Sequence, residues 1–242
     1  MTRAIISFDT ELSAGLHRRG ACARTNFESS ILGRCRDGDF GIHFQMDMLD
    51  RFGLKGVYFV DPMPALVHGP GIVDAIVGPI LARGHEVQLH LHTEWLEFAR
   101  FNPVGKLRGR NIGDFPFAAQ KKLIALARDI LMGAGAPRPT AFRAGNFGAN
   151  DDTLRVLAAL GFRFDSSFNA AWQGLGCDIT LDPANLGMRV HHGICEVPVS
   201  GLRDRASSFR PAQLCAMSEA EMRDALDHSA ASGAIQFSAF SH

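Results

Sequence analysis

The sequence predicts a single α/β domain built on a parallel sheet. Strand-like and helix-like segments alternate along almost all of its 242 residues, and this alternation is typical of parallel strands joined by helices. Apolar residues make up 46% of the chain and charged residues 21%, as in an ordinary globular protein with a substantial core. No internal repeat or domain boundary interrupts the pattern, so we treat residues 1–242 as one domain.

Seven segments have the length and composition of strands. Each is a short apolar run bounded by turn residues. Pro198 places one of them at a sheet edge or a bulge, because proline cannot donate to a strand ladder. The expected strands cover residues 4–8, 56–60, 87–92, 140–143, 162–165, 194–199 and 234–237.

Helical patterns, with apolar residues three and four positions apart, fill most of the intervals between these strands. Asn150 or Asp151 is suited to cap one helix, and Ser218 with Glu221 forms the capping box of another. Long polar loops separate some of the elements. The expected helices cover residues 44–52, 72–83, 117–131, 151–160 and 218–232, and the expected loops cover 14–39 and 100–116.

Composition and charge exclude several classes of protein. The formal net charge is zero, so no global field draws the chain to nucleic acid or a membrane. Five cysteines without a C-x-x-C pair argue against a disulfide framework and a cysteine zinc site. No run approaches the roughly 18 apolar residues of a membrane span. The first residues enter a strand without a signal-peptide pattern, and we expect a cytoplasmic protein.

Two histidines at the end of the third expected strand form the first candidate site. Val87, Leu89 and Leu91 alternate with polar residues, so His90 and His92 lie on one face of the strand. Their Cα atoms should be roughly 6.5–7 Å apart, close enough for both imidazoles to bind one metal ion. The alternative is that the pair only makes hydrogen bonds at the strand end.

The remaining histidines have simpler interpretations. His85 has the opposite parity to His90 and is expected to be structural, while His43 and His228 fall on expected helices. His191 and His192 precede the strand 194–199, so we expect them at its N-terminal end and away from the site. His17 and His68 fall in loops and stay unassigned.

Two acidic residues leave the first strand on one face. Asp9 and Glu11 share the parity of that strand, and the C-terminal ends of parallel strands are where sites form in α/β folds. Two carboxylates with two histidines suit zinc or another divalent transition metal better than calcium or magnesium. Taken alone, this acidic pair is also compatible with an ordinary polar strand exit.

Further charged residues end two other strands. Arg143 precedes a tight turn with Gly145 and Gly148, in which backbone N–H groups can face a ligand. Asp165 ends the following strand. An arginine and a carboxylate of this kind can pair, and Asp165 is therefore a candidate partner for Arg143.

The order of these motifs resembles the polysaccharide deacetylase (NodB-like, carbohydrate esterase family four) superfamily. Four segments carry the resemblance over residues 4–170: Ser-Phe-Asp-Thr-Glu, Gly-His-Glu-Val-Gln-Leu-His, Phe-Arg-Ala-Gly-Asn-Phe-Gly-Ala-Asn-Asp-Asp-Thr-Leu and Leu-Gly-Phe-Arg-Phe-Asp-Ser-Ser. Within that superfamily the sequence looks most like the divergent branch associated with surface-polysaccharide and lipopolysaccharide O-antigen loci. The resemblance implies an irregular (β/α)7 barrel and metal-dependent removal of acetyl groups from sugars.

The resemblance also assigns roles to the metal-site residues. Asp9 matches the catalytic base of the family. The usual ligand position next to it holds Thr10, and branches with a longer spacing place the ligand at the position of Glu11. His90 matches the first metal histidine. The second histidine normally follows four residues later, where this chain has Glu94; His92 is the replacement that shares a face with His90, and Glu94 is the alternative.

Three further residues complete the implied catalytic set. Arg143 and Asp165 match the third and fourth motifs and would hold the base in place. His242, the last residue of the sequence, matches the histidine that acts as general acid. The implied cofactor is a divalent metal, zinc first, with cobalt, nickel or manganese as alternatives.

The expected function is therefore the removal of acetyl groups from N- or O-acetylated sugars, in surface-polysaccharide or lipopolysaccharide biosynthesis. The partner would be an acetylated sugar or polysaccharide precursor, not nucleic acid. Arginine-rich loops at the strand ends favour an anionic substrate, unless they only keep long loops hydrated. The alternatives are a catalytically inactive sugar-binding member of the same fold, or another metal-dependent amidohydrolase.

Overall fold

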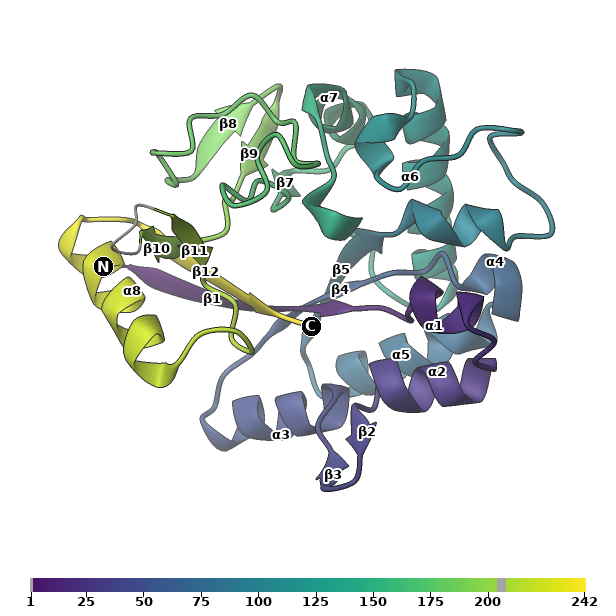
Figure 1. Ribbon diagram of the computed structural model, residues 1–242, viewed down its shortest axis with the longest axis horizontal. Coiled ribbons are helices and arrows are strands. Elements are labelled where there is room, and N and C mark those ends of the chain that lie inside the picture. The colour runs from purple at the N-terminus through teal and green to yellow at the C-terminus, as the bar shows by residue number, and fades with distance from the viewer. Residues whose placement is uncertain (1, 204–207) are drawn as a thin grey trace.

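The computed structural model describes residues 2–203 and 208–242 and is built around an eight-stranded sheet (Figure 1). The strand order is β12-β1-β4-β5-β6-β7-β9-β8, and all neighbours in it run parallel except β8 and β9. The sheet curls into a half-barrel, which confirms the predicted α/β class and agrees with an irregular (β/α) barrel. Its strands are β1 (Arg3–Thr10), β4 (Val57–Val60), β5 (Glu86–Leu91), β6 (Ala141–Ala144), β7 (Phe164–Asp165), β8 (Arg189–His191), β9 (Ile194–Glu196) and β12 (Gln236–Ser241).

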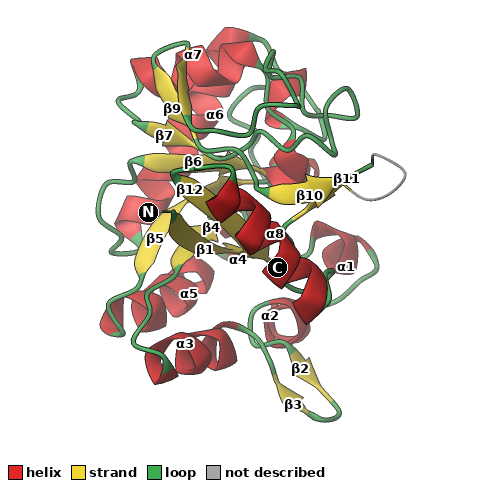
Figure 2. Cartoon of the chain, turned by 90° about the vertical axis from the view of Figure 1, so that its left-hand side faces the viewer, coloured by secondary structure: helices red, strands yellow, loops and turns green. Residues whose placement is uncertain are grey.

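Helices surround this sheet, and two small hairpins stand apart from it, with β2 and β3 beside α2 and α3 (Figures 1 and 2). The hairpins pair β2 (Arg34–Cys35) with β3 (Gly38–Asp39) and β10 (Gly201–Arg203) with β11 (Phe209–Pro211). Helix α8 packs against β12 and β10 (Figure 2). The helices are α1 (Ala14–Arg18), α2 (Ala23–Ser30), α3 (Ile42–Arg51), α4 (Ala65–His68), α5 (Gly71–Ala82), α6 (Phe117–Gly133), α7 (Asp151–Ala159) and α8 (Glu219–Ala231), with 3-10 turns at Thr93–Glu97, Ile112–Asp114 and Gly145–Phe147.

The packing of the core determines which face of β5 points into the half-barrel. Val87, Leu89 and Leu91 are buried on one face of this strand, and α5 and α6 both contact it. Ile80 of α5 and Leu123 of α6 are fully buried in the same apolar cluster. The alternate residues of β5 are therefore left to face the inside of the half-barrel, as the strand period predicts.

All seven expected strands are present, and the caps at Asn150 and Ser218 are confirmed. The expected loop 14–39 is wrong, because it contains α1, α2 and the β2–β3 hairpin. The side chain of Ser13 caps α1, while buried Asn26 of α2 binds the backbone of Ser13 through both its amide atoms. Polar tertiary contacts thus order two helices whose apolar pattern is weak.

His17 and His68 also lie in helices, not in loops. His17 is in α1 and His68 is in α4. Their rings lie 5.1 Å apart, and each also packs against Trp95, at 5.5 and 5.7 Å respectively. These two histidines therefore contribute to packing beside the sheet. Within the described residues, no helix combines the length and apolar character needed to cross a membrane.

Candidate metal and catalytic site

The register of the parallel strands gathers the predicted site residues at one edge of the sheet. Asp9 of β1 lies opposite Phe59 of β4, and His90 of β5 lies opposite Arg143 of β6. Ser241 of β12 pairs with Phe8 of β1, so His242 leaves the sheet next to Asp9. The carboxyl ends of five neighbouring strands thus surround one region.

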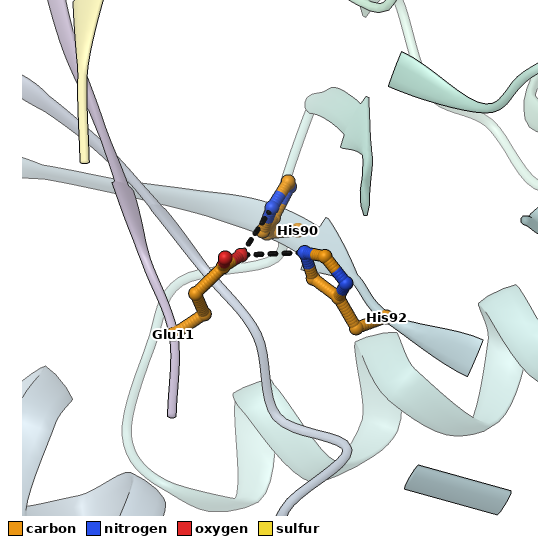
Figure 3. Close-up of side chains that lie close together, drawn as sticks. All are labelled: Glu11, His90 and His92. Atoms are coloured by element: carbon orange, nitrogen blue, oxygen red, sulfur yellow. Dashed lines mark ion pairs between the residues drawn. The ribbon is translucent and has the colours of Figure 1, made fainter. Parts of the chain in front are cut away.

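Three side chains converge on a single point in this region (Figure 3). Glu11 Oε2 lies 2.8 Å from His90 Nε2 and 2.6 Å from His92 Nε2. One ligand atom from each residue lies within 4.8 Å of the others. Glu11 follows β1, while both histidines come from the end of β5, so two strands separated only by β4 supply the cluster.

The hydrogen bonds behind the rings decide which nitrogen faces Glu11. His90 Nδ1 lies 2.7 Å from the Arg143 carbonyl, and His92 Nδ1 lies 2.9 Å from the Glu94 carboxylate. Both partners only accept hydrogen bonds, so each Nδ1 donates. In the neutral rings each Nε2 then presents a lone pair to Glu11, as in imidazoles that bind metals. Burial opposes protonation of His92, but Glu11 outweighs it and raises the pKa of His92 well above its usual value, so without a metal a proton lies between His92 Nε2 and Glu11. Of the two alternatives for the third ligand, His92 faces Glu11 and Glu94 lies behind it.

This arrangement fits a divalent transition metal. Glu11 Oε2 is buried and has no hydrogen-bond donor when both Nε2 atoms carry lone pairs. Burial opposes ionisation of Glu11, but His92 and His90 outweigh it and hold its pKa well below the usual value. An ionised carboxylate facing two imidazole lone pairs requires either protons or a cation between them. Two nitrogen donors and one oxygen donor are typical of zinc.

A buried ion pair lies directly beside this cluster. Arg143 Nη1 donates to Asp9 Oδ1 at 2.6 Å, and the two side chains are only 1% and 2% exposed. Arg143 Nη2 also donates to the hydroxyl groups of Ser7 and Ser166, both at 3.0 Å. The guanidinium carbon lies 4.3 Å from the centre of the Phe59 ring. Asp9 is therefore held in one orientation by a fully surrounded arginine.

A cavity of about 380 Å³ is lined by Asp9 of the ion pair and by Glu11 and His92 of the triad. Glu94 and Asn146 also line it. His242 is exposed at its rim. The structure thus brings Asp9, Glu11, His90, His92, Arg143 and His242 to one site.

Asp165, the seventh predicted site residue, does not pair with Arg143 in the structure. Asp165 accepts hydrogen bonds from Ser167 N at 3.0 Å and Ser167 Oγ at 2.8 Å, and it is bonded to Glu196. Burial and the neighbouring Asp165 raise the pKa of Glu196 well above its usual value, so Glu196 is protonated and donates to Asp165. The interpretation of Asp165 as the partner of Arg143 is wrong. It shapes the turn in which Ser166 binds Arg143.

Asn146 is one site residue that the sequence did not indicate as functional. It has a left-handed backbone, with φ of 55°, and its side chain lines the cavity and hydrogen-bonds to Glu94. Asparagine tolerates this conformation better than most residues. The turn after β6 therefore supports the group that orients His92.

Close backbone approach in the same turn gives a testable prediction. A Cβ at Gly145 would lie 2.7 Å from the His92 ring, so Gly145→Ala must displace that imidazole. We expect zinc affinity to fall by about 10- to 100-fold, as for other changes behind a metal ligand. Gly78→Ala in α5 is the control, because its Cβ would meet no atom within 4 Å. Equal zinc affinities of the two variants, measured by competition with a chelator, would show that His92 is not constrained by this contact.

Asp61 is a second site residue that was not predicted from the sequence. It directly follows the C-terminal end of β4, just as Asp9 lies near the C-terminal end of β1. It is fully buried, and its Oδ1 accepts hydrogen bonds from Met63 N at 3.1 Å and His92 N at 3.3 Å. Its Oδ2 has no partner among the described residues. Burial raises the pKa of Asp61 to about 6.

This raised pKa predicts the pH dependence of stability in metal-free protein. Between about pH 4 and pH 6 the folded state keeps a proton that the unfolded state has lost, so stability falls as pH rises through this interval. Asp61→Asn removes that effect and keeps the Oδ1 acceptor. At pH 8 we expect the variant to be about 2 kcal/mol more stable than the wild type, and this gain to vanish near pH 4. Urea unfolding of chelator-treated protein measures it; a gain independent of pH would contradict the assignment.

The half-barrel fold is shared with proteins of known structure. The structure is similar to a Mycobacterium smegmatis protein described, provisionally, as a polysaccharide deacetylase, over 100% of this chain and 76% of that chain, with a TM-score of 0.63 and 17% identity. It is also similar to 4-alpha-glucanotransferase from Thermococcus litoralis, over 100% of this chain and 33% of that chain, with a TM-score of 0.56 and 10% identity. The chitin deacetylase of Colletotrichum lindemuthianum matches 97% of this chain and 84% of its own, with a TM-score of 0.42 and 10% identity.

No protein-family model and no curated protein matches the sequence significantly. At identities of 17% and 10%, the structural similarity establishes the fold alone. The two more similar structures carry names for different reactions, and one fold can host many chemistries. The activity must therefore be argued from the residues of the site.

Proposed function

We propose that this protein is a metal-dependent hydrolase that removes acetyl groups from N- or O-acetylated sugars. One observation carries the proposal: a fixed carboxylate, Asp9, opens into the same cavity as Glu11 and His92, which converge with His90 on one point. A base next to a metal-binding cluster is the arrangement required for metal-assisted hydrolysis. The fold shared with a polysaccharide deacetylase supports a sugar as the substrate.

Glu11, His90 and His92 would hold the ion, with zinc as the first candidate and cobalt, nickel or manganese as alternatives. When bound, a divalent ion supplies a Lewis acid for the acetyl carbonyl. Glu94 and the Arg143 carbonyl keep the two imidazoles in the required tautomer. The remaining chemistry belongs to side chains that move protons.

Asp9 is the proposed general base. Its carboxylate accepts the proton of the attacking water, and Arg143 keeps it oriented toward the cavity. Ser7 and Ser166 hold Arg143 in turn. Asp9 is therefore positioned before the substrate arrives, which lowers the cost of reaching the reactive geometry.

His242 is the proposed general acid, because an imidazole can carry a proton near neutral pH and deliver it to the departing amine or alcohol. We expect His242→Gln to lower kcat by roughly 10²-fold or more and to leave the bound metal unchanged. The exposed His43 of α3 provides the control substitution, His43→Gln. Rates of acetate release and metal content per chain measure both effects, and an unchanged kcat would remove His242 from the mechanism.

The charge around the cavity refines the proposed substrate. Several arginines of the arginine-rich loops are neutralised: Arg24 and Arg34 both contact Glu28 at 3.0 Å, and Arg210 pairs with Glu221. These ion pairs reduce the positive charge that the loops present.

Two arginines remain close to the site. Arg108 and Arg110 line a cavity of about 760 Å³ that also contains Glu94, a residue of the metal cavity. Arginine suits phosphate and carboxylate groups through paired hydrogen bonds. We therefore propose an anionic acetylated sugar, such as a surface-polysaccharide or lipopolysaccharide precursor, as the substrate.

Acetate release from a panel of acetylated sugars tests both the proposed deacetylation and the proposed preference for anionic sugars. The panel contains neutral N- and O-acetylated oligosaccharides and counterparts that carry uronate or phosphate groups. We expect zinc-dependent release, with a higher kcat/KM on the anionic sugars that falls as salt is raised. No acetate from any sugar by zinc-loaded protein would favour an inactive sugar-binding protein. Release from neutral and anionic sugars with equal kcat/KM would remove only the anionic refinement.

A further inference from the structure

A second cluster of metal-type ligands lies where the β8–β9 hairpin meets α7. His191 Nε2 lies 3.3 Å from Asp151 Oδ1, and His192 Nε2 lies 3.2 Å from Asp151 Oδ2. One ligand atom from each residue lies within 4.8 Å of the others. None of these residues takes part in the proposed hydrolysis.

The hairpin turn brings the two histidines to the same side. His192 and Gly193 have φ of 47° and 83°, both in the left-handed region, as two-residue hairpin turns require. Neighbouring residues of a regular strand point to opposite faces, but this bend leaves the rings of His191 and His192 with centroids 4.1 Å apart. The turn therefore presents two imidazoles together.

The third ligand is held in place before any ion arrives. Thr180 N donates to Asp151 Oδ1 at 2.9 Å, and the Thr180 hydroxyl donates to Oδ2. Burial opposes ionisation of Asp151, but these hydrogen bonds and the two histidines outweigh it and lower its pKa to about 2. Asp151 is thus a fixed carboxylate facing two rings.

The tautomer of His192 indicates what is missing from the cluster. Arg155 Nη2 lies 3.3 Å from His192 Nε2, and a guanidinium only donates hydrogen bonds. His192 Nε2 then carries a lone pair, which also faces the ionised Asp151 Oδ2 at 3.2 Å. In that tautomer two acceptors face each other, and a proton or a cation between them would satisfy both.

We propose that Asp151, His191 and His192 form a second divalent-metal site, separate from the proposed catalytic site. Two imidazoles and a carboxylate suit zinc, and a further position stays open for water. The three side chains are 20–25% exposed, so an ion can enter from solvent. Because β8 is the edge strand of the main sheet, a bound ion would join this edge to α7.

The test separates the two sites by removing the other one first. In His90→Ala protein, we expect one zinc ion per chain after dialysis and a rise in Tm when zinc is added. We expect both to disappear in His90→Ala/His192→Asn, in which asparagine still tolerates the left-handed turn. His90→Ala/His43→Gln should keep the ion. A His90→Ala protein that binds no zinc, or an ion that survives His192→Asn, would overturn the proposal.

A second variant tests the site without removing a ligand. Arg155 places a positive charge beside His192, so Arg155→Gln should tighten zinc binding roughly threefold or more. The measurement uses His90→Ala protein, whose only proposed zinc site is this one, and zinc content does not depend on enzymatic activity. An unchanged or weaker affinity would contradict a metal at this position. Failure here would leave acetate release by the wild type untouched, so the two proposals can fail independently.

Discussion

Replacement of Asp9 by asparagine is expected to lower kcat for acetate release by about 10²- to 10⁴-fold while the metal stays bound. Asparagine keeps the shape of the side chain and still offers an oxygen to Arg143 Nη1, which now lies 2.6 Å from Asp9 Oδ1. Its amide is not basic, so it cannot accept the proton of the attacking water. The loss should therefore fall on turnover, while Glu11, His90 and His92 keep their geometry.

Metal content per chain and initial rates, measured on the same preparations, separate these effects. Asp74→Asn on the exposed part of α5 is the matched control and should change neither. Unfolding midpoints show whether the variant is folded at the assay temperature. Full activity of Asp9→Asn would remove it as the base, and loss of metal would instead place Asp9 among the ligands.

Replacement of Arg143 by methionine is expected to lower the free energy of unfolding by about 3–5 kcal/mol. The guanidinium is 1% exposed and pairs with a carboxylate that is 2% exposed. Its removal leaves Asp9 charged and buried without a partner, and Ser7 and Ser166 lose a hydrogen bond. Breaking one half of a buried pair costs more than an exposed pair contributes.

Two comparisons isolate the origin of that cost. The double variant Asp9→Leu/Arg143→Met should recover much of the lost stability, because no unpaired charge remains. Arg24→Met removes an arginine that is 85% exposed and pairs with Glu28, so it should cost less than about 1 kcal/mol. If Arg143→Met were no more destabilising than Arg24→Met in urea unfolding, Arg143 would not be what holds Asp9.

The strand period makes the central part of the site predictable from sequence. Side chains two positions apart on a strand share a face, so the period alone groups His90 with His92 and Asp9 with Glu11. The parallel order of β1, β4, β5 and β6 then aligns their carboxyl ends. Both the strand period and the alternation of strands and helices that indicates a parallel sheet are local patterns, so they can be read from the sequence.

The parts that were not predicted depend on contacts between distant segments. Arg143 and Asp9 are far apart in sequence, and Arg143 on β6 reaches Asp9 on β1 across β5 and β4, on the side away from β7 and Asp165. The burial of Asp61 and the proton on Glu196 both follow from tertiary neighbours. The short helices α1 and α2 are ordered by polar contacts that leave little apolar pattern. No local signal identifies these features.

The most direct test of the proposed metal-dependent chemistry is anomalous scattering at the zinc absorption edge from crystals grown with zinc. We expect a peak coordinated by Glu11 Oε2, His90 Nε2 and His92 Nε2, with Asp9 beside it in the cavity and Glu94 still hydrogen-bonded to His92 Nδ1. Zinc-saturated crystals without a peak between these three atoms, or with the ion held by Glu94 in place of His92, would contradict it.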